Sequence, residues 1–413
     1  MPFPGSSILR ETVVMVLAGG QGERLYPLTK VRSKPSVPFG GKYRIIDFSL
    51  SNCLNSGLRR IYVLTQYKSD SLNQHLFEAW SIFNPELGEF IYSVPPQRKM
   101  NNDWYLGTAN AIYQNKNLFS NDNKARWVLI LGGDHIYKMD YLSLLQSHLA
   151  KMADLSIACI EVPQSEADRF GIVEVDEEYR VKSFIEKPEN PSEIPDKPGH
   201  SFVNMGIYVF NANVLRNVIS EMEEKNLKPY DFGKDVIPYM VKNNQPVYAY
   251  KFEEEDKKEN PYWRDIGTLD SYFSASMDLT SISPEFNLYD SDWPIRTHQY
   301  QFPPAKTLSH EGERVGRSIN SLICDGSIIS GGLVERSILG PNVKINSFAY
   351  VTDSIIMYNC NIGRHARIRR AIIDKNVTIP EGYEIGFDLE SDKKKFTVTE
   401  SGIVVIGKNA ILP

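Results

Sequence analysis

Apolar and polar residues alternate in blocks along the first two thirds of the chain, and these blocks predict strands and helices in turn. Short continuous apolar runs predict buried strands at Val13–Ala18, Ile61–Thr65, Trp127–Leu131 and Leu155–Ile160. Apolar residues at helical spacing predict helices at Ile45–Asn55, Ser69–Trp80 and Tyr141–Lys151. This alternation is typical of an α/β domain with a largely parallel sheet, whose ligands bind outside the carboxyl ends of the strands.

The following segment, up to Thr280, predicts a less regular region. Strand-forming segments dominate residues 170–210, with the sequences GIVEV, VKSFIEK and MGIYVF. Helices are predicted at Val214–Glu224, Lys234–Lys242 and Leu269–Thr280, and the last of these closes the first domain. Loops are predicted at residues 84–107, which are rich in Pro, Asn and Gly, and at the charged run Glu253–Glu259.

The last third of the chain has a different pattern. Four prolines between Pro284 and Pro304 interrupt any periodicity over residues 281–310, which predicts a linker lying over a surface. Beyond it, apolar residues recur every five or six positions from Ile323 to Val377, with Gly, Asn and Asp between them. This spacing is typical of the hexapeptide repeat of a parallel β-helix, and an exposed meander is the alternative.

Composition and charge narrow the classes of function. The chain has 413 residues, 42% hydrophobic and 23% charged, so we expect two globular domains with ordinary cores. The formal net charge of −5 argues against a nucleic-acid-binding protein. The four cysteines form no C-x-x-C pair, and neither a signal peptide nor an apolar run long enough for a membrane span is apparent. We therefore expect a cytoplasmic protein without nucleic-acid or membrane partners.

A turn with almost no side chains follows the first predicted strand. Gly19, Gly20 and Gly22 let the backbone approach another group closely, and N–H groups in such a turn form a seat for anions. Arg24 follows and can donate paired hydrogen bonds to phosphate oxygens. An ordinary glycine-rich loop is the alternative, since the segment is neither a G-x-G-x-x-G nor a Walker sequence.

The wider sequence around this turn resembles a known family. LAGGQGERLYPLT followed by SKP is similar to the GGxGxRLxPLTxxxxKP pattern of the sugar-nucleotide pyrophosphorylases. Further segments resemble the glucose-1-phosphate adenylyltransferases: FGGKYRIIDFSLSNCLNSG (39–57), WYLGTANA (104–111), GGDHIYKMDY (132–141), EKPENP (186–191), NMGIYVF (204–210) and YWRDIGTLDSY (262–272). The resemblance runs from about Val13 to the C-terminus. It implies a Rossmann-like nucleotidyltransferase domain over residues 1–280, a linker over 281–310 and a left-handed β-helix over 311–413.

The resemblance also implies an activity. Members transfer the adenylyl group of ATP to glucose 1-phosphate, giving ADP-glucose and pyrophosphate for glycogen- or starch-type glucan synthesis, and phosphorylated metabolites regulate them. A homotetramer is implied in the same way. The alternatives are a catalytically silent regulatory subunit of the family, or a pyrophosphorylase that uses another nucleotide or sugar phosphate. Such a transfer depends on positioning and charge neutralisation, so metal, cations and backbone amides suffice.

Two aspartates are the candidate metal ligands. Asp134 follows a predicted strand and two glycines, where a carboxylate is suited either to Mg²⁺ or to a helix N-cap. Asp265 is the second carboxylate, in the sequence WRDIG. The resemblance implies that Asp134 and Asp265 together hold Mg²⁺.

The remaining site residues are implied by the resemblance alone. Arg24 and Lys34 match the cations that neutralise the triphosphate, Lys187 the group that binds the sugar phosphate, and Glu186 the group that binds sugar hydroxyls. Asn204 stands where Ser is usual, Asn110 where Asp is usual, and Leu106 where Arg or Gln is common. The full expected set of substrate-binding residues is Gly19, Gly20, Gly22, Gln66, Tyr105, Gly107, Gly171, Glu186, Lys187 and Asn204.

Regulation is expected at a cluster of cations. Arg32 and Arg44 match positions that bind an inhibitory phosphate effector, and Lys408 resembles an activator lysine. Arg369 and Arg370 are expected to join them, if the β-helix packs against the first domain. The alternative for each arginine is a solvated side chain or an ordinary ion pair. The sequence leaves the identity of activator and inhibitor open, since Val31 replaces a residue that is basic in many relatives.

Overall fold

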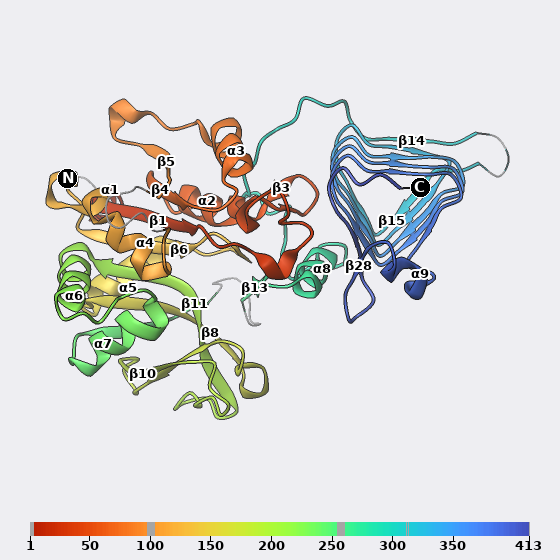
Figure 1. Ribbon diagram of the computed structural model, residues 1–413. Helices are drawn as coiled ribbons and strands as arrows, with labels where there is room; N and C mark the ends of the chain where they lie inside the picture. Colours follow the sequence, from red (N-terminus) through yellow and green to blue (C-terminus); the bar gives the residue numbers. More distant parts are fainter. Residues whose placement is uncertain (1–3, 97–103, 254–260, 311, 313, 413) are drawn as a thin grey trace.

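The computed structural model describes residues 4–96, 104–253, 261–310, 312 and 314–412. Figure 1 shows a twisted sheet with helices on its faces and, beside it, a prism of short stacked strands. These are the Rossmann-like domain with a mixed sheet and the parallel β-helix that the sequence predicts, so the fold class is confirmed. Within the described ranges, no helix combines the length and apolar composition that crossing a membrane requires.

The sheet is parallel on one side and mixed on the other. Its strand order is β10-β9-β11-β6-β1-β4-β5, and β8 and β12 lie off this path. β1 pairs in parallel with β4 and β6, and β4 with β5, whereas β11 runs antiparallel to β6 and β8. The strands are β1 (Thr12–Ala18), β4 (Arg60–Thr65), β5 (Phe90–Val94), β6 (Trp127–Gly132), β8 (Leu155–Pro163), β9 (Gly171–Val175), β10 (Val181–Glu186), β11 (His200–Asn211) and β12 (Val247–Lys251).

Helices cover both faces of this sheet. Successive residues of β1 point to opposite faces, so Val13 and Met15 join one core cluster and Val14 and Val16 another. The first cluster includes residues of α4, α6 and α7, and the second residues of α2, α3 and α5. The helices are α1 (Pro4–Glu11), α2 (Ile45–Asn55), α3 (Asp70–Trp80), α4 (Thr108–Gln114), α5 (Tyr141–Ala150), α6 (Ala212–Glu224), α7 (Ile237–Lys242) and α8 (Leu269–Asp278).

Several predicted elements differ from the observed ones. Residues 84–107 are not a loop throughout, because they contain β5, a short edge strand whose Tyr92 is exposed. The helix predicted at Lys234–Lys242 begins as a π-turn at Phe232–Val236 and becomes α7 only at Ile237, with Pro238 in its first turn. Residues 97–103 and most of the charged run Glu253–Glu259 lie outside the described residues.

The predicted linker lies along α2. Trp293 Nε1 donates to Asn52 Oδ1 at 2.8 Å, and the Arg296 backbone N–H donates to Ser51 Oγ at 2.8 Å. The first β-helix strand, β14, begins at Lys306, which is five residues before the boundary expected at 311. The domain division at 280 and 311 stays a prediction.

The prism is built from three sheets of parallel strands, to which β28 adds one antiparallel strand beside β29. One contains β14 (Lys306–Leu308), β17 (Ile328–Ser330), β20 (Lys344–Ile345), β23 (Asn361–Ile362) and β26 (Thr378–Ile379). The second contains β15 (Arg317–Ile319), β18 (Leu333–Glu335), β21 (Tyr350–Thr352), β24 (Arg367–Arg369) and β27 (Glu384–Ile385). The third contains β16 (Leu322–Ile323), β19 (Ile338–Leu339), β22 (Ile355–Ile356), β25 (Ala371–Ile373), β29 (Val404–Ile406) and β28 (Thr397–Val398), with α9 (Leu389–Lys393) before β28.

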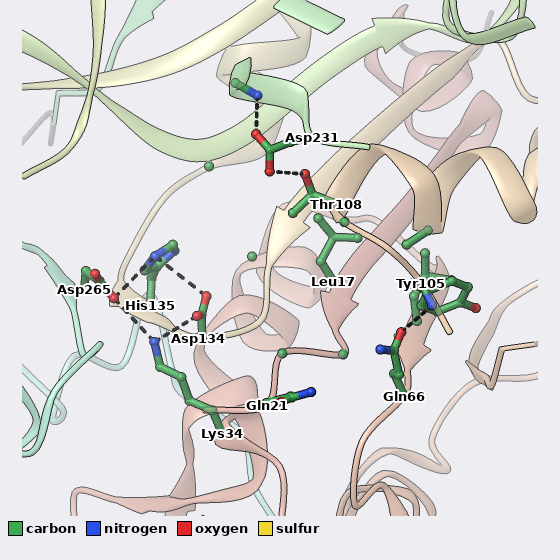
Figure 2. Close-up of a pocket in the computed structure, with 18 of the residues that line it drawn as sticks. Leu17, Gln21, Lys34, Gln66, Tyr105, Thr108, Asp134, His135, Asp231 and Asp265 are labelled. Atoms are coloured by element: carbon green, nitrogen blue, oxygen red, sulfur yellow. Dashed lines mark hydrogen bonds and ion pairs between the residues drawn. The ribbon is translucent and has the colours of Figure 1, made fainter. Parts of the chain in front are cut away.

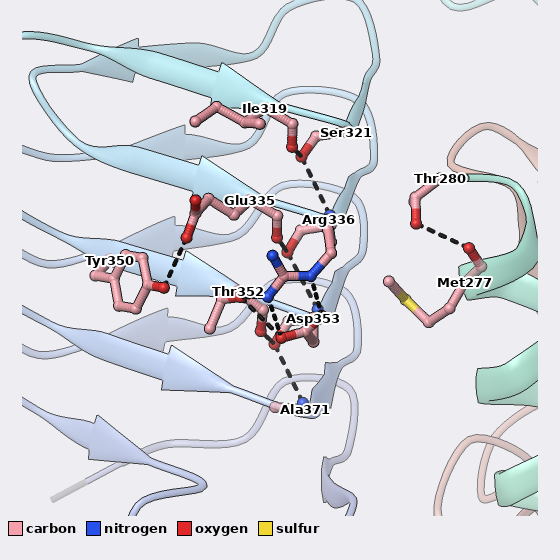
Figure 3. Close-up of polar contacts among 12 residues, drawn as sticks. Met277, Thr280, Ile319, Ser321, Glu335, Arg336, Tyr350, Thr352, Asp353 and Ala371 are labelled. Atoms are coloured by element: carbon pink, nitrogen blue, oxygen red, sulfur yellow. Dashed lines mark hydrogen bonds and ion pairs between the residues drawn. The ribbon is translucent and has the colours of Figure 1, made fainter. Parts of the chain in front are cut away.

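Hydrogen-bonded ladders of side chains hold two corners of the prism. At one corner Asn342 donates to Asn359, Asn359 to Asn376 and Asn376 to Asn409, at 2.8 to 3.0 Å. These asparagines have φ near +60°, a left-handed conformation that asparagine tolerates better than most residues. At another corner, drawn in Figure 3, stacked serines accept backbone N–H groups of the next coil, and Arg336 pairs with Asp353.

The two bodies share a buried apolar interface. Phe39 and Phe48 of the first body lie in one core cluster with Ile355 and Ile372 of the prism. The side chain of Asp270, in the first turn of α8, accepts hydrogen bonds from Thr399 and Ser401. Figure 1 accordingly shows α8 beside the edge of the prism that carries β28. The prism is thereby joined to the helix that starts a few residues after Asp265.

Candidate functional site

A cavity of about 590 Å³ opens at the carboxyl ends of β1, β4 and β6, where the sequence places the site. Most of the expected residues line it, and they come from segments spread over 250 residues of chain. They are Gly19, Gly20, Arg24, Lys34, Gln66, Tyr105, Gly107, Asp134, Glu186, Asn204 and Asp265. Gly22, Gly171 and Lys187 do not line it directly. Figure 2 shows the carboxylates on one side of this cavity and Gln66 with Tyr105 on the other.

Two glycines allow Lys34 and Asp134 to lie close to the glycine turn. Gly22 has φ +67°, and a Cβ there would lie 3.0 Å from Lys34 Cβ. The tight approach seats Lys34 beneath the turn. Gly133 donates its N–H to Leu17 O at 3.1 Å, and a Cβ on Gly133 would lie 3.2 Å from that same oxygen. Asp134 follows, so the close approach of these strand ends sets its carboxylate beside the turn.

The carboxylates of Asp134 and Asp265 meet at one ammonium group. Lys34 Nζ lies 2.8 Å from Asp134 Oδ2 and 3.4 Å from Asp265 Oδ1. β13 (Trp263–Asp265) pairs with β7 (His135–Tyr137), and this pairing sets Asp265 opposite His135, next to Asp134. The structure thus brings together two residues that are 131 positions apart in the sequence.

Neighbouring charges keep Asp134 and Lys34 ionised. Burial would raise the pKa of Asp134, but Lys34, with His135 and Arg24, outweighs burial and holds that pKa well below its usual range. Burial would likewise lower the pKa of Lys34, and the charges of Asp134 and Asp265 overcome this and raise it. The Asp134 carboxylate therefore stays anionic at neutral pH, paired with the Lys34 ammonium.

This donor set fits a divalent cation. One ligand atom each from Asp134, His135 and Asp265 lies within 4.8 Å of the others. Two carboxylates with room for substrate oxygens are the protein contribution that Mg²⁺ commonly uses. Neither aspartate is the side-chain cap of a described helix, since α5 and α8 are capped by Asp140 and Thr268.

The opposite wall of the cavity is held by hydrogen bonds among its own residues. Gln66 Oε1 accepts from the Tyr105 backbone N–H at 2.9 Å, which leaves the Gln66 amide NH₂ as a donor. Asn110, the unusual residue of this segment, accepts from Leu106 N–H and Gln114 Nε2. The amide oxygen of Asn110 therefore connects the loop before α4 to α4 itself. The side chain of Leu106 is half exposed.

Glu186 and Asn204, two of the residues expected to bind the sugar, line the cavity. Asn204 Nδ2 donates to Tyr208 OH at 2.8 Å, and its Oδ1 accepts from Gly206 N–H. A Cβ on Gly171 would lie 2.9 Å from Glu186 Oε2, so this glycine makes space for the Glu186 carboxylate rather than forming the wall. Lys187 is mostly exposed, with Nζ 3.7 Å from Glu186 Oε1, and lies at the rim.

Sequence reasoning missed several residues that line the cavity. Thr108 Oγ1 donates to Asp231 Oδ2 at 3.1 Å and joins segments 123 residues apart, a contact that no spacing predicts. Asp231 also accepts from the Gly233 and Lys234 N–H groups, and the sequence Asp-Phe-Gly was the available signal of a cap. His135, Tyr208 and Gln21 are the other residues with polar side chains in this missed set.

The cations expected to bind effectors divide into two groups. Arg32 donates from Nη2 to both carboxylate oxygens of Asp374, at 2.9 and 2.8 Å, across the interface between the two bodies. Arg44 and Lys375 line a cleft at this interface, and Lys408 is close enough to affect the pKa of Lys375. That pKa is lowered to about 7, first by burial and then by Arg44 and Arg32.

Arg369 and Arg370 do not join this cluster, contrary to expectation. They precede β25, whereas Asp374 and Lys375 follow it at the other corner of the prism. Arg369 donates to Gly386 O, and Arg370 donates to Ser401 O and lies over the Phe273 ring. The two arginines therefore lie at one end of β25, and Lys375 lies at the other end.

Comparison with known proteins gives consistent results over almost the whole chain. Residues 13–282 match a family model described as nucleotidyl transferase, and residues 303–406 match one described as GlmU-like, C-terminal hexapeptide. Glucose-1-phosphate adenylyltransferase of Nitrosomonas europaea is 49% identical over 97% of this chain and 93% of its own length. That of Koribacter versatilis is 50% identical over 97% of this chain and 96% of its own length. Glucose-1-phosphate adenylyltransferase 2 of Vibrio cholerae is 49% identical, with shares of 96% and 98%.

Proposed function

Because the chain belongs to the glucose-1-phosphate adenylyltransferase family of nucleotidyl transferases, we propose that it makes ADP-glucose and pyrophosphate from ATP and glucose 1-phosphate. The observation that carries this proposal is the convergence of Lys34, Asp134 and Asp265 beneath the glycine turn, in a cavity that also reaches Glu186 and Asn204. One cavity therefore offers a seat for a triphosphate and, beyond it, a polar end for a sugar.

In this proposal the chain contributes positioning and charge. The N–H groups of Gly19 and Gly20, with Arg24, bind the triphosphate, and Lys34 lies next to the phosphate that is attacked. Lys187 binds the sugar phosphate, and Glu186 and Asn204 orient the sugar. A sugar phosphate oxygen forms a bond to the α-phosphorus, and the bond to pyrophosphate breaks in line with it. The attacking oxygen is already ionised, so no side chain has to accept a proton.

We further propose that Asp134 and Asp265 hold Mg²⁺, which when bound neutralises phosphate charge and favours departure of pyrophosphate. Four free cysteines, three of them buried, suit the reduced cytoplasm as the location. The homotetramer expected from the resemblance belongs to the same proposal.

Assay of the purified chain tests the proposal. We would measure pyrophosphate release with each nucleoside triphosphate and each sugar 1-phosphate in Mg²⁺, and identify the sugar nucleotide formed. ATP with glucose 1-phosphate should give the highest kcat/KM. A silent regulatory subunit would show no turnover with any pair. The presence of Arg24, Lys34, Asp134 and Asp265 in one cavity favours the catalyst over that alternative.

The interface cleft supports a second part of the proposal, regulation by phosphorylated metabolites. Arg44 and Lys375 line this cleft together with Lys42 and two histidines. Its volume is about 10 Å³, which holds roughly one water, so an effector requires the two bodies to move apart. Phosphate, AMP, fructose 1,6-bisphosphate, fructose 6-phosphate and 3-phosphoglycerate would be titrated into wild type and Arg44→Ala. The regulatory proposal fails if no anion alters wild-type kinetics, or if every response survives the substitution.

A further inference from the structure

The imidazole of His135 lies at the two carboxylates, although the proposed reaction gives it no role. Its Nε2 is 3.7 Å from Asp134 Oδ1 and 3.8 Å from Asp265 Oδ1, too far for hydrogen bonds. Two atoms that each lie ~2.1 Å from one cation are at most ~4.2 Å apart. Both separations fall below this limit, so a single ion can contact His135 and either aspartate without a rearrangement of the backbone.

The fold aims this ring by packing rather than by hydrogen bonding. His135 is the first residue of β7, directly opposite Asp265 in β13. Its ring packs against Trp263, with centroids 5.1 Å apart. Its Nδ1 is buried and has no hydrogen-bond partner in the part of the chain that the structure describes. Packing alone therefore turns Nε2 toward the carboxylates.

The neighbouring lysine leaves one oxygen of Asp134 available to a cation, although its Nζ also lies 3.4 Å from Asp265 Oδ1, the oxygen that faces His135. Lys34 Nζ contacts the other oxygen of Asp134, Oδ2, at 2.8 Å. Asp134 Oδ1 consequently faces His135 and takes no hydrogen bond from Lys34. The cluster thus presents one carboxylate oxygen from each aspartate and one imidazole nitrogen, all within 4.8 Å of one another.

We propose that His135 is the third protein ligand of the divalent cation held by Asp134 and Asp265, and that it makes this a mixed nitrogen and oxygen site. The inference rests on the proposed function in placing a metal at the two carboxylates. Imidazole suits the later first-row transition metals, whereas Mg²⁺ and Mn²⁺ are suited to oxygen ligands, and Co²⁺ binds such sites more tightly than Mn²⁺. The site therefore binds Co²⁺ with a preference over Mg²⁺ that depends on His135.

Pulsed electron paramagnetic resonance of bound Mn²⁺ tests this ligand directly. Mn²⁺ would be added to the full chain alone and with inorganic pyrophosphate, which contains no nitrogen. We expect a coupling to ¹⁴N in the wild type that changes to that of ¹⁵N when only the histidines are labelled. This comparison uses the unaltered protein, so it does not depend on the folding of a variant. Absence of a histidine coupling to bound Mn²⁺ overturns the proposal.

Variants locate the signal and test the metal preference. His135→Asn should abolish the coupling and lower Co²⁺ affinity about 10-fold or more, with less than about a 3-fold change for Mg²⁺. His365→Asn, which alters a surface histidine of the prism stacked on Phe348, is the matched control and should change neither. Persistence of the coupling in His135→Asn, or of Mn²⁺ binding in Asp134→Asn, contradicts the proposal. Failure of ADP-glucose synthesis beside an intact histidine coupling would refute the proposed function alone.

Discussion

Removal of one partner from the buried ion pair between Arg32 and Asp374 should strongly destabilise the junction of the two bodies. Both side chains are almost fully buried, with exposed fractions of 3% and 1%. Replacement of Asp374 by Ala leaves the guanidinium buried without a counter-ion, among Arg44 and Lys375. At an effective dielectric of about 20, two charges about 4 Å apart attract by about 4 kcal/mol. Loss of one partner of a buried pair costs about 3–5 kcal/mol, which agrees with that figure.

The prism supplies a matched control. Arg336 pairs with Asp353 through two hydrogen bonds, Nε to Oδ1 at 2.7 Å and Nη2 to Oδ2 at 2.9 Å, but both side chains are partly exposed. Asp353→Ala should therefore lower the free energy of unfolding by about 1 kcal/mol or less. The two variants differ in burial and not in the type of pair.

Urea denaturation followed by two signals measures the effect. The five tryptophans all precede residue 300, so their fluorescence reports on the first body, whereas far-ultraviolet circular dichroism reports on both. We expect Asp374→Ala to lower the free energy of unfolding by about 3–5 kcal/mol and to separate the two signals into distinct transitions. Equal losses in the Asp374 and Asp353 variants, or a loss of less than about 1 kcal/mol for Asp374→Ala, would refute the reasoning.

Three further predictions concern the site and the interface. Asp134→Asn should lower kcat by about 10³-fold or more with an unchanged circular dichroism spectrum, because the amide loses the charge that binds metal; near-wild-type kcat would remove this aspartate from the metal site. Lys187→Ala should raise KM for glucose 1-phosphate about 10- to 100-fold and leave KM for ATP nearly unchanged, and equal rises would contradict its assignment to the sugar phosphate. Burial, with Arg44 and Arg32, lowers the pKa of Lys375 to about 7. The unfolded chain therefore binds more protons above that pH, so stability should rise between pH 7 and about 10.5, and Lys375→Met should reduce this slope.

Local sequence patterns were sufficient for the elements that lie in the core. β1, β4 and β6 are buried, so their apolar runs are continuous and the predicted bounds differ from the observed ones by a residue or so. β5 was missed although Phe90, Ile91 and Tyr92 form a short apolar run, because the surrounding Pro, Asn and Gly residues favoured a loop over this edge strand. The π-turn at Phe232–Val236 was missed because helical spacing does not distinguish it from α-helix.

The sequence predicted most residues that line the candidate site, but it did not predict which of them contact one another. Asp134 could be placed from the strand before it, whereas its approach to Asp265 depends on the pairing of β7 with β13, two strands of three residues each. The contact between Thr108 and Asp231, and the opposite positions of Arg370 and Asp374 along β25, likewise follow from tertiary structure. Chemical roles came from the resemblance to a family, since spacing alone also allows helix caps and surface cations.

The asparagine ladder marks the start of each new coil of the prism, and the length of chain between two of its asparagines can vary. Its first two rungs join residues 17 positions apart, whereas the last joins Asn376 to Asn409, which are 33 positions apart. The additional residues form an excursion that contains α9 and β28 and returns to the prism in register at β29. An insertion at a corner can therefore be accommodated if the chain re-enters on the same rung, whereas loss of one residue within a strand would turn its core side chains outward. Asp270 of α8 accepts hydrogen bonds from Thr399 and Ser401, which lie in this excursion. The inserted residues therefore also contact the neighbouring domain.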